Sequence, residues 1–210
     1  MSLPVALESQ HILRYADAVV PTRVGDLRLV VYRVGEPNPL LLPTQYEEHM
    51  AIVRGDVRGD DVMARVHSEC WTGETLGSLK CDCRAQLDAA LDAIAHEGRG
   101  LVVYLRQEGR GIGLGNKVRA YALQNEGADT VEANTALGFA ADLRSYGIAA
   151  AILSDLGVRS VALMTNNPDK ERGLEAAGVH VARRIPHWVG DNDTNRDYLD
   201  VKRAKLGHHE

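Results

Sequence analysis

Three cysteines lie close together in the sequence: Cys70, Cys81 and Cys83. A thiolate is a strong ligand for Zn²⁺, and a catalytic zinc usually takes three protein ligands and leaves a fourth position for water. Two other interpretations are open, because a buried cysteine can act as a small apolar residue and two of the three could form a disulfide. The charged Asp82 between the last two cysteines argues against an apolar core segment. We therefore predict a zinc site built from the three cysteines.

Polar residues precede the first cysteine in the segment RVHSEC. Glu69 is adjacent to a predicted metal ligand, where a carboxylate can take a proton from metal-bound water and return it to a leaving nitrogen. His67 and Glu69 form an H-x-E unit like that of the zinc deaminases, but the later C-x-C differs from their P-C-x-x-C. The pattern indicates related chemistry, hydrolytic attack on a carbon of a nitrogen heterocycle, carried by a different motif.

A glycine-rich segment, RQEGRGIGLGNK, follows an expected strand and precedes an expected helix. Glycine lets backbone amides approach a phosphate closely, and Arg106, Arg110 and Lys117 add positive charge. The segment matches neither the Walker A loop nor the dinucleotide-binding fingerprint, because Asn116 stands in place of the third glycine of that fingerprint. A phosphate-binding loop and a flexible loop with solvated basic residues are both open at this point.

The hydrophobic pattern of the first half predicts strands followed by a helix. Alternation predicts one strand around residues 27–32 and two short strands at 49–54 and 62–67. We expect these strands to form an antiparallel meander that delivers the RVHSEC segment from a strand end. A short helix is expected around residues 9–17, where the pattern is weak. Apolar residues repeat every 3.6 positions over residues 86–96, so a helix should begin just after the last two cysteines.

Strands and helices alternate in the second half. The apolar runs at 100–105 and 159–165 predict strands that are covered on both faces, and residues 117–124 and 148–156 predict helices. A turn into a helix, a final strand and a polar tail follow. The predicted fold is α/β, with a mixed sheet whose N-terminal part is antiparallel and whose remainder alternates strand and helix.

Further candidate residues lie in this half of the chain. Thr165 and Lys170 follow the carboxyl end of a predicted strand, which is where ligands bind in open α/β sheets. Asp142 and Arg144 are two residues apart and would not share a helix face. If both contact one ligand, they must lie in irregular backbone before the next helix. A solvated acid and base is the other interpretation of this pair.

The composition is that of an ordinary globular chain of 210 residues, 45% hydrophobic and 25% charged. A formal net charge of −5 argues against a general binder of nucleic acid or of an anionic membrane. No apolar run approaches the roughly 20 residues of a membrane span, and the start of the sequence lacks the pattern of a signal peptide. We expect a cytoplasmic protein, in which metal or catalytic roles of cysteine are favoured over disulfides.

Several segments together resemble the GTP cyclohydrolase II family: RVHSEC, the Cys70-x10-Cys81-x-Cys83 spacing, RQEGRGIGL, NKVRAYALQ, GADTVEAN and LMTNNPDK. The resemblance implies that GTP is hydrolysed to 2,5-diamino-6-ribosylamino-4(3H)-pyrimidinone 5′-phosphate, formate and pyrophosphate, the first step of riboflavin biosynthesis. It also implies Zn²⁺ and Mg²⁺ as cofactors and a homodimer. Many family members are fused to a synthase domain for which this chain is too short. We therefore expect a stand-alone cyclohydrolase, a single domain over residues 1–210 whose first 45 residues carry no assignable motif.

The resemblance implies roles for individual residues. Cys70, Cys81 and Cys83 match the zinc ligands of the family. Asp142 matches a proposed proton acceptor, Arg144 a proposed nucleophile, and Tyr121 a tyrosine of the ring-opening chemistry, and we add Glu69 to this catalytic set. The residues that match GTP contacts are Arg65, Val66, His67, Ser68, Glu69, Gln86, Glu108, Gly109, Arg110, Thr130, Thr165 and Lys170.

Two questions are open from the sequence. A guanidinium stays protonated to a pH above about 12 and has no free lone pair, so Arg144 could be an activated nucleophile or a bidentate phosphate clamp. The function has two rivals: an enzyme that opens the imidazole ring but keeps the formyl group, and a GTP-binding module without activity. The cysteine triad argues against the module, and its combination with Tyr121 favours full removal of formate.

Overall fold

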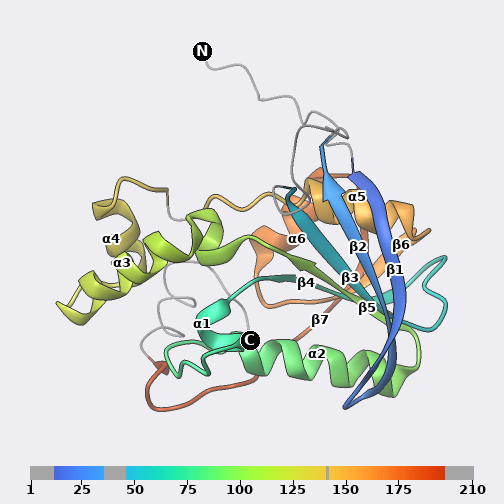
Figure 1. Ribbon diagram of the computed structural model, residues 1–210, viewed down its shortest axis with the longest axis horizontal. Helices are drawn as coiled ribbons and strands as arrows, with labels where there is room; N and C mark the ends of the chain where they lie inside the picture. Colours follow the sequence, from blue (N-terminus) through green and yellow to red (C-terminus); the bar gives the residue numbers. More distant parts are fainter. Residues whose placement is uncertain (1–11, 36–45, 141, 197–210) are drawn as a thin grey trace.

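One seven-stranded sheet organises the part of the chain that the computed structural model describes, residues 12–35, 46–140 and 142–196 (Figure 1). The strands, in their order across the sheet, are β1 (Ile12–Thr22), β2 (Gly25–Val34), β3 (Glu48–Arg54), β5 (Gly100–Leu105), β4 (Val62–Ser68), β6 (Ser160–Met164) and β7 (His180–Ile185). The helices are α1 (Trp71–Glu74), α2 (Cys83–Glu97), α3 (Gly113–Asn125), α4 (Thr130–Ala136), α5 (Gly147–Asp155) and α6 (Pro168–Ala176), with a 3-10 turn, η2 (Glu108–Gly111).

The sheet is mixed, as the sequence predicts. β1, β2, β3 and β5 pair antiparallel in that order, and β5, β4, β6 and β7 pair parallel. Strand and helix alternate from β5 onward, so the predicted α/β class is confirmed. Because β4, β5 and β6 run in the same direction, their carboxyl ends meet at one edge of the sheet. Residues that follow these three strands are therefore brought together there.

Two expectations about the first third are wrong. The strand at residues 62–68 does not extend an antiparallel meander, because β5 is inserted between β3 and β4 and pairs parallel with β4. The helix expected around residues 9–17 is also absent, since residues 12–17 belong to β1 and residues 9–11 lie outside the described ranges. Cross-strand pairing with β2 overrides the weak helical pattern there.

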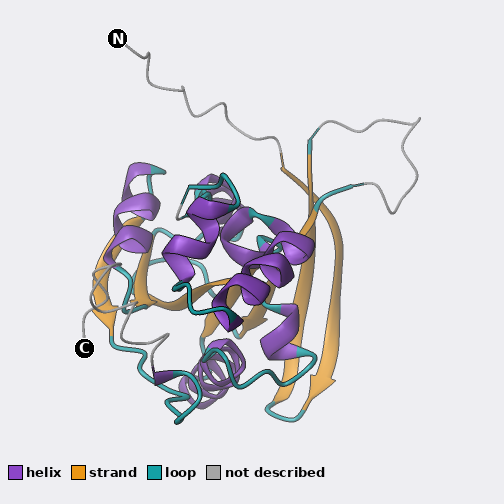
Figure 2. Cartoon of the chain, turned by 90° about the vertical axis from the view of Figure 1, so that its left-hand side faces the viewer, coloured by secondary structure: helices purple, strands orange, loops and turns teal. Residues whose placement is uncertain are grey.

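Helices cover both faces of the parallel part of the sheet. Ala90 and Ile94 of α2 pack with Val102 of β5 on one face. Val103, the next residue of β5, packs with Ile152 of α5 on the opposite face. Figure 1 shows α2 below the sheet and α5 and α6 above it. In Figure 2 the helices gather to the left of the long β1–β2 hairpin. The core is therefore two apolar layers separated by the sheet, which explains the continuous apolar run of β5.

The helix boundaries differ from the predictions in ways that matter for the site. α2 begins at Cys83, three residues before the expected start, and ends before Gly98, whose φ of 74° is left-handed. α3 begins at Gly113, and α4 is not predicted from the sequence. The polar tail after residue 196 lies outside the described residues. Among the helices of the described ranges, none has the length and apolar character needed to cross a membrane.

Candidate functional site

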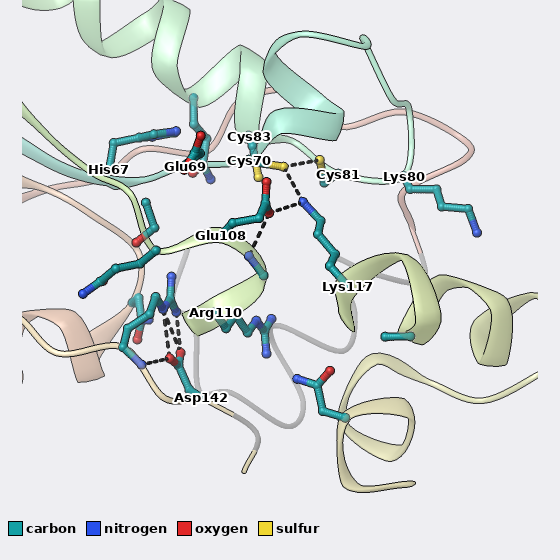
Figure 3. A pocket seen from close by; sticks show the side chains of 18 of the residues that line it. His67, Glu69, Cys70, Lys80, Cys81, Cys83, Glu108, Arg110, Lys117 and Asp142 are labelled. Atoms are coloured by element: carbon teal, nitrogen blue, oxygen red, sulfur yellow. Dashed lines mark hydrogen bonds and ion pairs between the residues drawn. The ribbon is translucent and has the colours of Figure 1, made fainter. Parts of the chain in front are cut away.

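A cavity of about 370 Å³ lies at the edge of the sheet where β4, β5 and β6 end (Figure 3). Its lining comes from segments that are far apart in the sequence and that follow each of these strands. β4 leads to the cysteine segment, β5 to the glycine-rich turn, and β6 to the segment TNNPDK before and within α6. α3 and the irregular segment before α5 close the remaining sides. The topology thus places three predicted motifs around one cavity.

The three cysteines form one cluster. Cys70 follows β4, Cys81 lies in the loop after α1, and Cys83 is the first residue of α2. Their sulfur atoms all lie within 4.8 Å of one another, and Cys70 Sγ is 3.6 Å from Cys81 Sγ. All three are free thiols, so the disulfide interpretation is excluded in this structure. Two sulfurs bound to one zinc at about 2.3 Å are about 3.8 Å apart in a tetrahedron, so the cluster could bind a metal ion.

A glycine makes room for this cluster. A Cβ atom on Gly73 would lie 2.9 Å from Cys81 Sγ and 3.2 Å from Cys70 Sγ. Gly73 belongs to α1 and needs no left-handed backbone, so the requirement for glycine here is space. The only sequence signal for this residue was its position between the cysteines. The short helix therefore wraps its bare backbone against the sulfur atoms, which is consistent with a metal site.

Hydrogen bonds within the cluster and a nearby positive charge change the pKa values of the three thiols. Hydrogen bonds from the other two cysteines, together with the Lys117 ammonium, hold the pKa of Cys70 well below its usual range. Hydrogen bonding to that thiolate raises the pKa of Cys81 to about 11 and that of Cys83 well above its usual range. The surroundings thus favour a thiolate at Cys70, and metal binding would release the thiol protons that remain in the cluster.

The segment Arg65–Glu69 presents buried polar atoms that lack partners among the described residues. These atoms are Arg65 Nε, His67 Nδ1 and Ser68 Oγ. The Arg65 guanidinium donates to the Met164 carbonyl and to Gln86 Oε1, and burial lowers its pKa to about 10. An unsatisfied buried polar group is costly, so this end of the cavity is suited to a polar ligand.

Glu74 is a carboxylate with a side chain only 9% exposed, and sequence reasoning missed it. Its Oε1 lies 2.7 Å from His67 Nε2 and accepts from the Cys70 amide at 3.0 Å, and its Oε2 accepts from the Tyr104 hydroxyl. The contact assigns the proton of the imidazole to Nε2, which leaves Nδ1 as the atom without a partner. The only sequence signal was a carboxylate four residues after Cys70, on the helical turn that holds the cluster.

Val66 differs from its neighbours in the predicted GTP-binding segment. Its side chain is fully buried in the core and does not line the cavity. Its carbonyl oxygen accepts a hydrogen bond of 2.7 Å from Lys170 Nζ, which belongs to α6. The Val66 backbone therefore holds Lys170 at the cavity.

The glycine-rich segment forms a tight turn at the cavity wall. Gly109 and Arg110 both have left-handed backbone, with φ values of 62° and 60°, and Arg110 is a non-glycine residue in that region. Arg110 contributes a buried guanidinium nitrogen, Nη1, without a partner among the described residues. The Glu108 carboxylate accepts from the Trp71 amide at 2.6 Å and from the Gly109 amide at 2.7 Å. The turn thus directs a cation into the cavity, and α3 begins directly after it at Gly113.

Asp142 and Arg144 lie in irregular backbone before α5, as the sequence reasoning required, and both line the cavity. Arg144 Nε donates to Asp142 Oδ1 at 2.9 Å, and Nη2 donates to Oδ2, so the pair is bidentate. Burial opposes ionisation of Asp142, but the hydrogen bonds from Arg144 outweigh it and lower the pKa of the carboxyl group. The pair is therefore an ion pair rather than two solvated charges.

The remaining predicted residues are placed as follows. Tyr121 projects from α3, its hydroxyl is 3.3 Å from Thr72 Oγ1, and burial raises its pKa to about 12. Thr165 is buried and its hydroxyl accepts from the Asn167 amide at 3.0 Å. Thr130 begins α4, and its side chain is outside the described part of the structure. Apart from Val66 and Thr130, every predicted site residue lines the one cavity.

The fold and the site together define an α/β protein with a cysteine cluster that could bind a metal at the carboxyl edge of its parallel strands. The model of the GTP cyclohydrolase II family matches residues 13–186. The chain belongs to the GTP cyclohydrolase II family.

Similar proteins include two named "Riboflavin biosynthesis protein RibBA". The protein of Chlorobium phaeovibrioides is 52% identical over 201 residues, which cover 95% of this chain and 47% of that protein. The protein of Mycobacterium tuberculosis is 53% identical over 207 residues, which cover 95% of this chain and 46% of that protein. The chain thus spans about half the length of these curated relatives. A two-domain 3,4-dihydroxy-2-butanone 4-phosphate synthase from A. baumannii, RibBX, aligns with a TM-score of 0.43 at 21% identity over 76% of this chain and 35% of that one.

Proposed function

We propose that the cavity is the active site of a zinc-dependent GTP cyclohydrolase II, which converts GTP and water to 2,5-diamino-6-ribosylamino-4(3H)-pyrimidinone 5′-phosphate, formate and pyrophosphate. The observation that carries the proposal is the meeting of a three-thiol cluster and several cations in one cavity of a chain of this family. Hydrolysis of a purine ring calls for a metal site, and departure of pyrophosphate calls for positive charge. The cavity supports both requirements.

Cys70, Cys81 and Cys83 would hold the zinc ion, which supplies a water ligand of lowered pKa and a Lewis acid. Two nearby residues are suited to proton transfer. Glu69 lines the cavity, its side chain is 20% exposed, and Arg106 Nε contacts its Oε2 at 3.5 Å. We assign it the part of accepting and returning protons. Burial raises the pKa of Tyr121 to about 12, so its hydroxyl keeps its proton well above neutral pH, and we assign it the part of a proton donor.

The cations would bind the triphosphate together with Mg²⁺. Arg110 and Lys170 line the cavity and are suited to phosphate oxygens. For Arg144 we favour the phosphate clamp over the covalent nucleophile. The bidentate bond to the Asp142 carboxylate stabilises the charged guanidinium, which has no lone pair for attack on phosphorus. In this arrangement Asp142 orients Arg144 and balances its charge.

The cellular setting is also a proposal. The names of the relatives support a place in riboflavin biosynthesis, where this reaction would be the first step. A homodimer rests on the resemblance to the family alone, and a cytoplasmic location rests on the expected metal role of the cysteines. Because the chain spans about half of each relative, we assign it only the cyclohydrolase activity.

The test is a single incubation with GTP, Mg²⁺ and Zn²⁺ in which formate, pyrophosphate and pyrimidine are measured together. We expect equal amounts of all three, and no formate from Cys81→Ser, whose fold is checked by thermal unfolding. Pyrophosphate and an opened ring without formate would instead identify the enzyme that retains the formyl group. Zinc-loaded protein that binds GTP but forms no product would identify the binding module and refute the proposal.

A further inference from the structure

Lys117 projects from α3 to the cysteine cluster, and its side chain is only 13% exposed. Its Nζ atom is 3.0 Å from Cys70 Sγ and 2.7 Å from Glu108 Oε1. Figure 3 shows the ammonium group between the sulfur of Cys70 and the carboxylate of Glu108. One side chain therefore bridges the cluster and the glycine-rich turn.

The surroundings fix the position of this ammonium. A Cβ atom on Gly109 would be 3.1 Å from Lys117 Cβ, so the turn packs directly against the lysine stem. Glu108 is held in turn by the Trp71 amide, which belongs to the helix that wraps the cysteines. The lysine head thus has one defined place, in contact with the sulfur of Cys70 and the carboxylate of Glu108.

The net charge of the cluster with a metal bound explains why a positive charge is needed beside Cys70. Three thiolates and one divalent cation carry a net charge of −1, which is costly to bury without a compensating positive charge. A hydrogen bond from an ammonium to one thiolate offsets that charge and fixes the orientation of the ligand. Groups that bond to metal ligands in this way commonly change metal affinity by about 10–100-fold when they are removed.

We propose that Lys117 is a positioning residue of the metal centre, which compensates the charge of the Cys70 thiolate and ties the cluster to the glycine-rich turn through Glu108. The inference rests on the proposed zinc site. A simpler alternative is that Lys117 only neutralises the buried Glu108 carboxylate. The two differ in what removal of both charges does to zinc binding.

The experiment measures zinc affinity by competition with a chromophoric chelator in Lys117→Met, Lys117→Arg and the double variant Lys117→Met/Glu108→Gln. Lys80→Met is the matched control, because Lys80 also lies near the Tyr121 ring but donates to Asn125 Oδ1 rather than to a thiolate. The absorption of the Co²⁺-substituted proteins in the sulfur-to-cobalt charge-transfer region gives a second readout that is independent of activity.

We expect Lys117→Met to bind zinc about 10–100-fold more weakly than the wild type. Lys117→Arg should retain most of the affinity because it keeps the positive charge and the donor groups, and Lys80→Met should match the wild type. The charge-transfer band should shift in Lys117→Met and not in Lys80→Met. The double variant should remain weak, because the Cys70 thiolate still lacks its ammonium.

Unchanged zinc affinity in Lys117→Met, or wild-type affinity in the double variant, would overturn the proposal and leave Lys117 as the partner of Glu108 alone. If Lys117→Met fails to fold, the double variant still tests the proposal. It removes the Glu108 charge as well, so no buried carboxylate is left without its cation. A wild type that binds no zinc would be a different result, since it refutes the proposed metal site itself.

Discussion

Gly73→Ala should damage the metal site without straining the backbone. Gly73 lies in the helical turn α1, where alanine is ordinarily favoured over glycine by roughly 1 kcal/mol. The new methyl carbon would, however, lie 2.9 Å from Cys81 Sγ and 3.2 Å from Cys70 Sγ. Carbon and sulfur are in contact at about 3.5 Å, so at least one sulfur must move. The effect should therefore appear in metal binding.

The expected magnitude follows from the cost of overpacking. One extra methyl group in a packed site costs about 1–3 kcal/mol. At about 1.4 kcal/mol per factor of ten, zinc should bind about 5- to 150-fold more weakly. Gly115→Ala is the matched control, because Gly115 lies in α3 with no atom within 4 Å of the added Cβ. That variant should bind zinc normally and should be more stable by about 0.5–1 kcal/mol.

The assay is chelator competition for zinc, with urea unfolding of the metal-free proteins alongside. A Gly73→Ala protein that binds zinc as tightly as the wild type would refute the argument that α1 is fitted to the sulfur atoms. Equal weakening in Gly115→Ala would show that the effect comes from helix propensity or general stability rather than from contact with the cluster.

Three further predictions concern ionisation and strain. Burial and the charge of Arg65 lower the pKa of His187 to about 4 in the folded protein, so the unfolded chain takes up a proton below pH 6.5 that the folded protein does not. Stability should fall as the pH drops from 6.5 toward 4, by about 2 kcal/mol at pH 5 from this residue alone. Urea unfolding at pH 7.5 and 5 should show a smaller loss in His187→Gln, and equal losses would contradict the assignment. Arg110 has a φ of 60°, so the free energy of unfolding should be about 1 kcal/mol higher in Arg110→Gly than in Arg110→Ala. Both variants should bind a non-hydrolysable GTP analogue more weakly than the wild type. Equal stability of the two variants would exclude backbone strain at this position. Tyr121→Phe should reduce formate release by about 10²–10⁴-fold without changing the shape of the pH profile up to pH 10. If the wild type alone lost activity as the pH rises toward 10, Tyr121 would ionise in that range, which would contradict its raised pKa.

Much of the fold could be predicted because local patterns were strong. The apolar run of β5, the periodicity of α2 and the glycine after it specify their structures almost independently of context. The pairing of β4 could not be predicted in the same way. Its partner β5 is more than 30 residues away, and hydrophobic alternation alone does not distinguish a parallel from an antiparallel neighbour. Strand order is decided by which helices must cover which face.

The residues of the candidate site were likewise predicted only in part. Residues with distinctive chemistry and spacing, such as the three cysteines, were identified directly, and all of them are brought together. Gly73 and Glu74 were not assigned to the site, and Lys117 was expected only as a cation of the glycine-rich segment, because their roles depend on what they touch. A glycine that yields space, a carboxylate that orients an imidazole and a lysine that reaches a thiolate leave no pattern in a single sequence.

The most direct test of the central claim is metal removal and restoration on one preparation, with formate and pyrophosphate measured from GTP in the presence of Mg²⁺. We predict that formate release disappears when zinc is removed by a chelator and returns with one equivalent of Zn²⁺ per chain, and that Cys81→Ser does not recover. Undiminished formate release from protein shown to be free of zinc would contradict the account, because the three-cysteine cluster would then have no part in opening the ring.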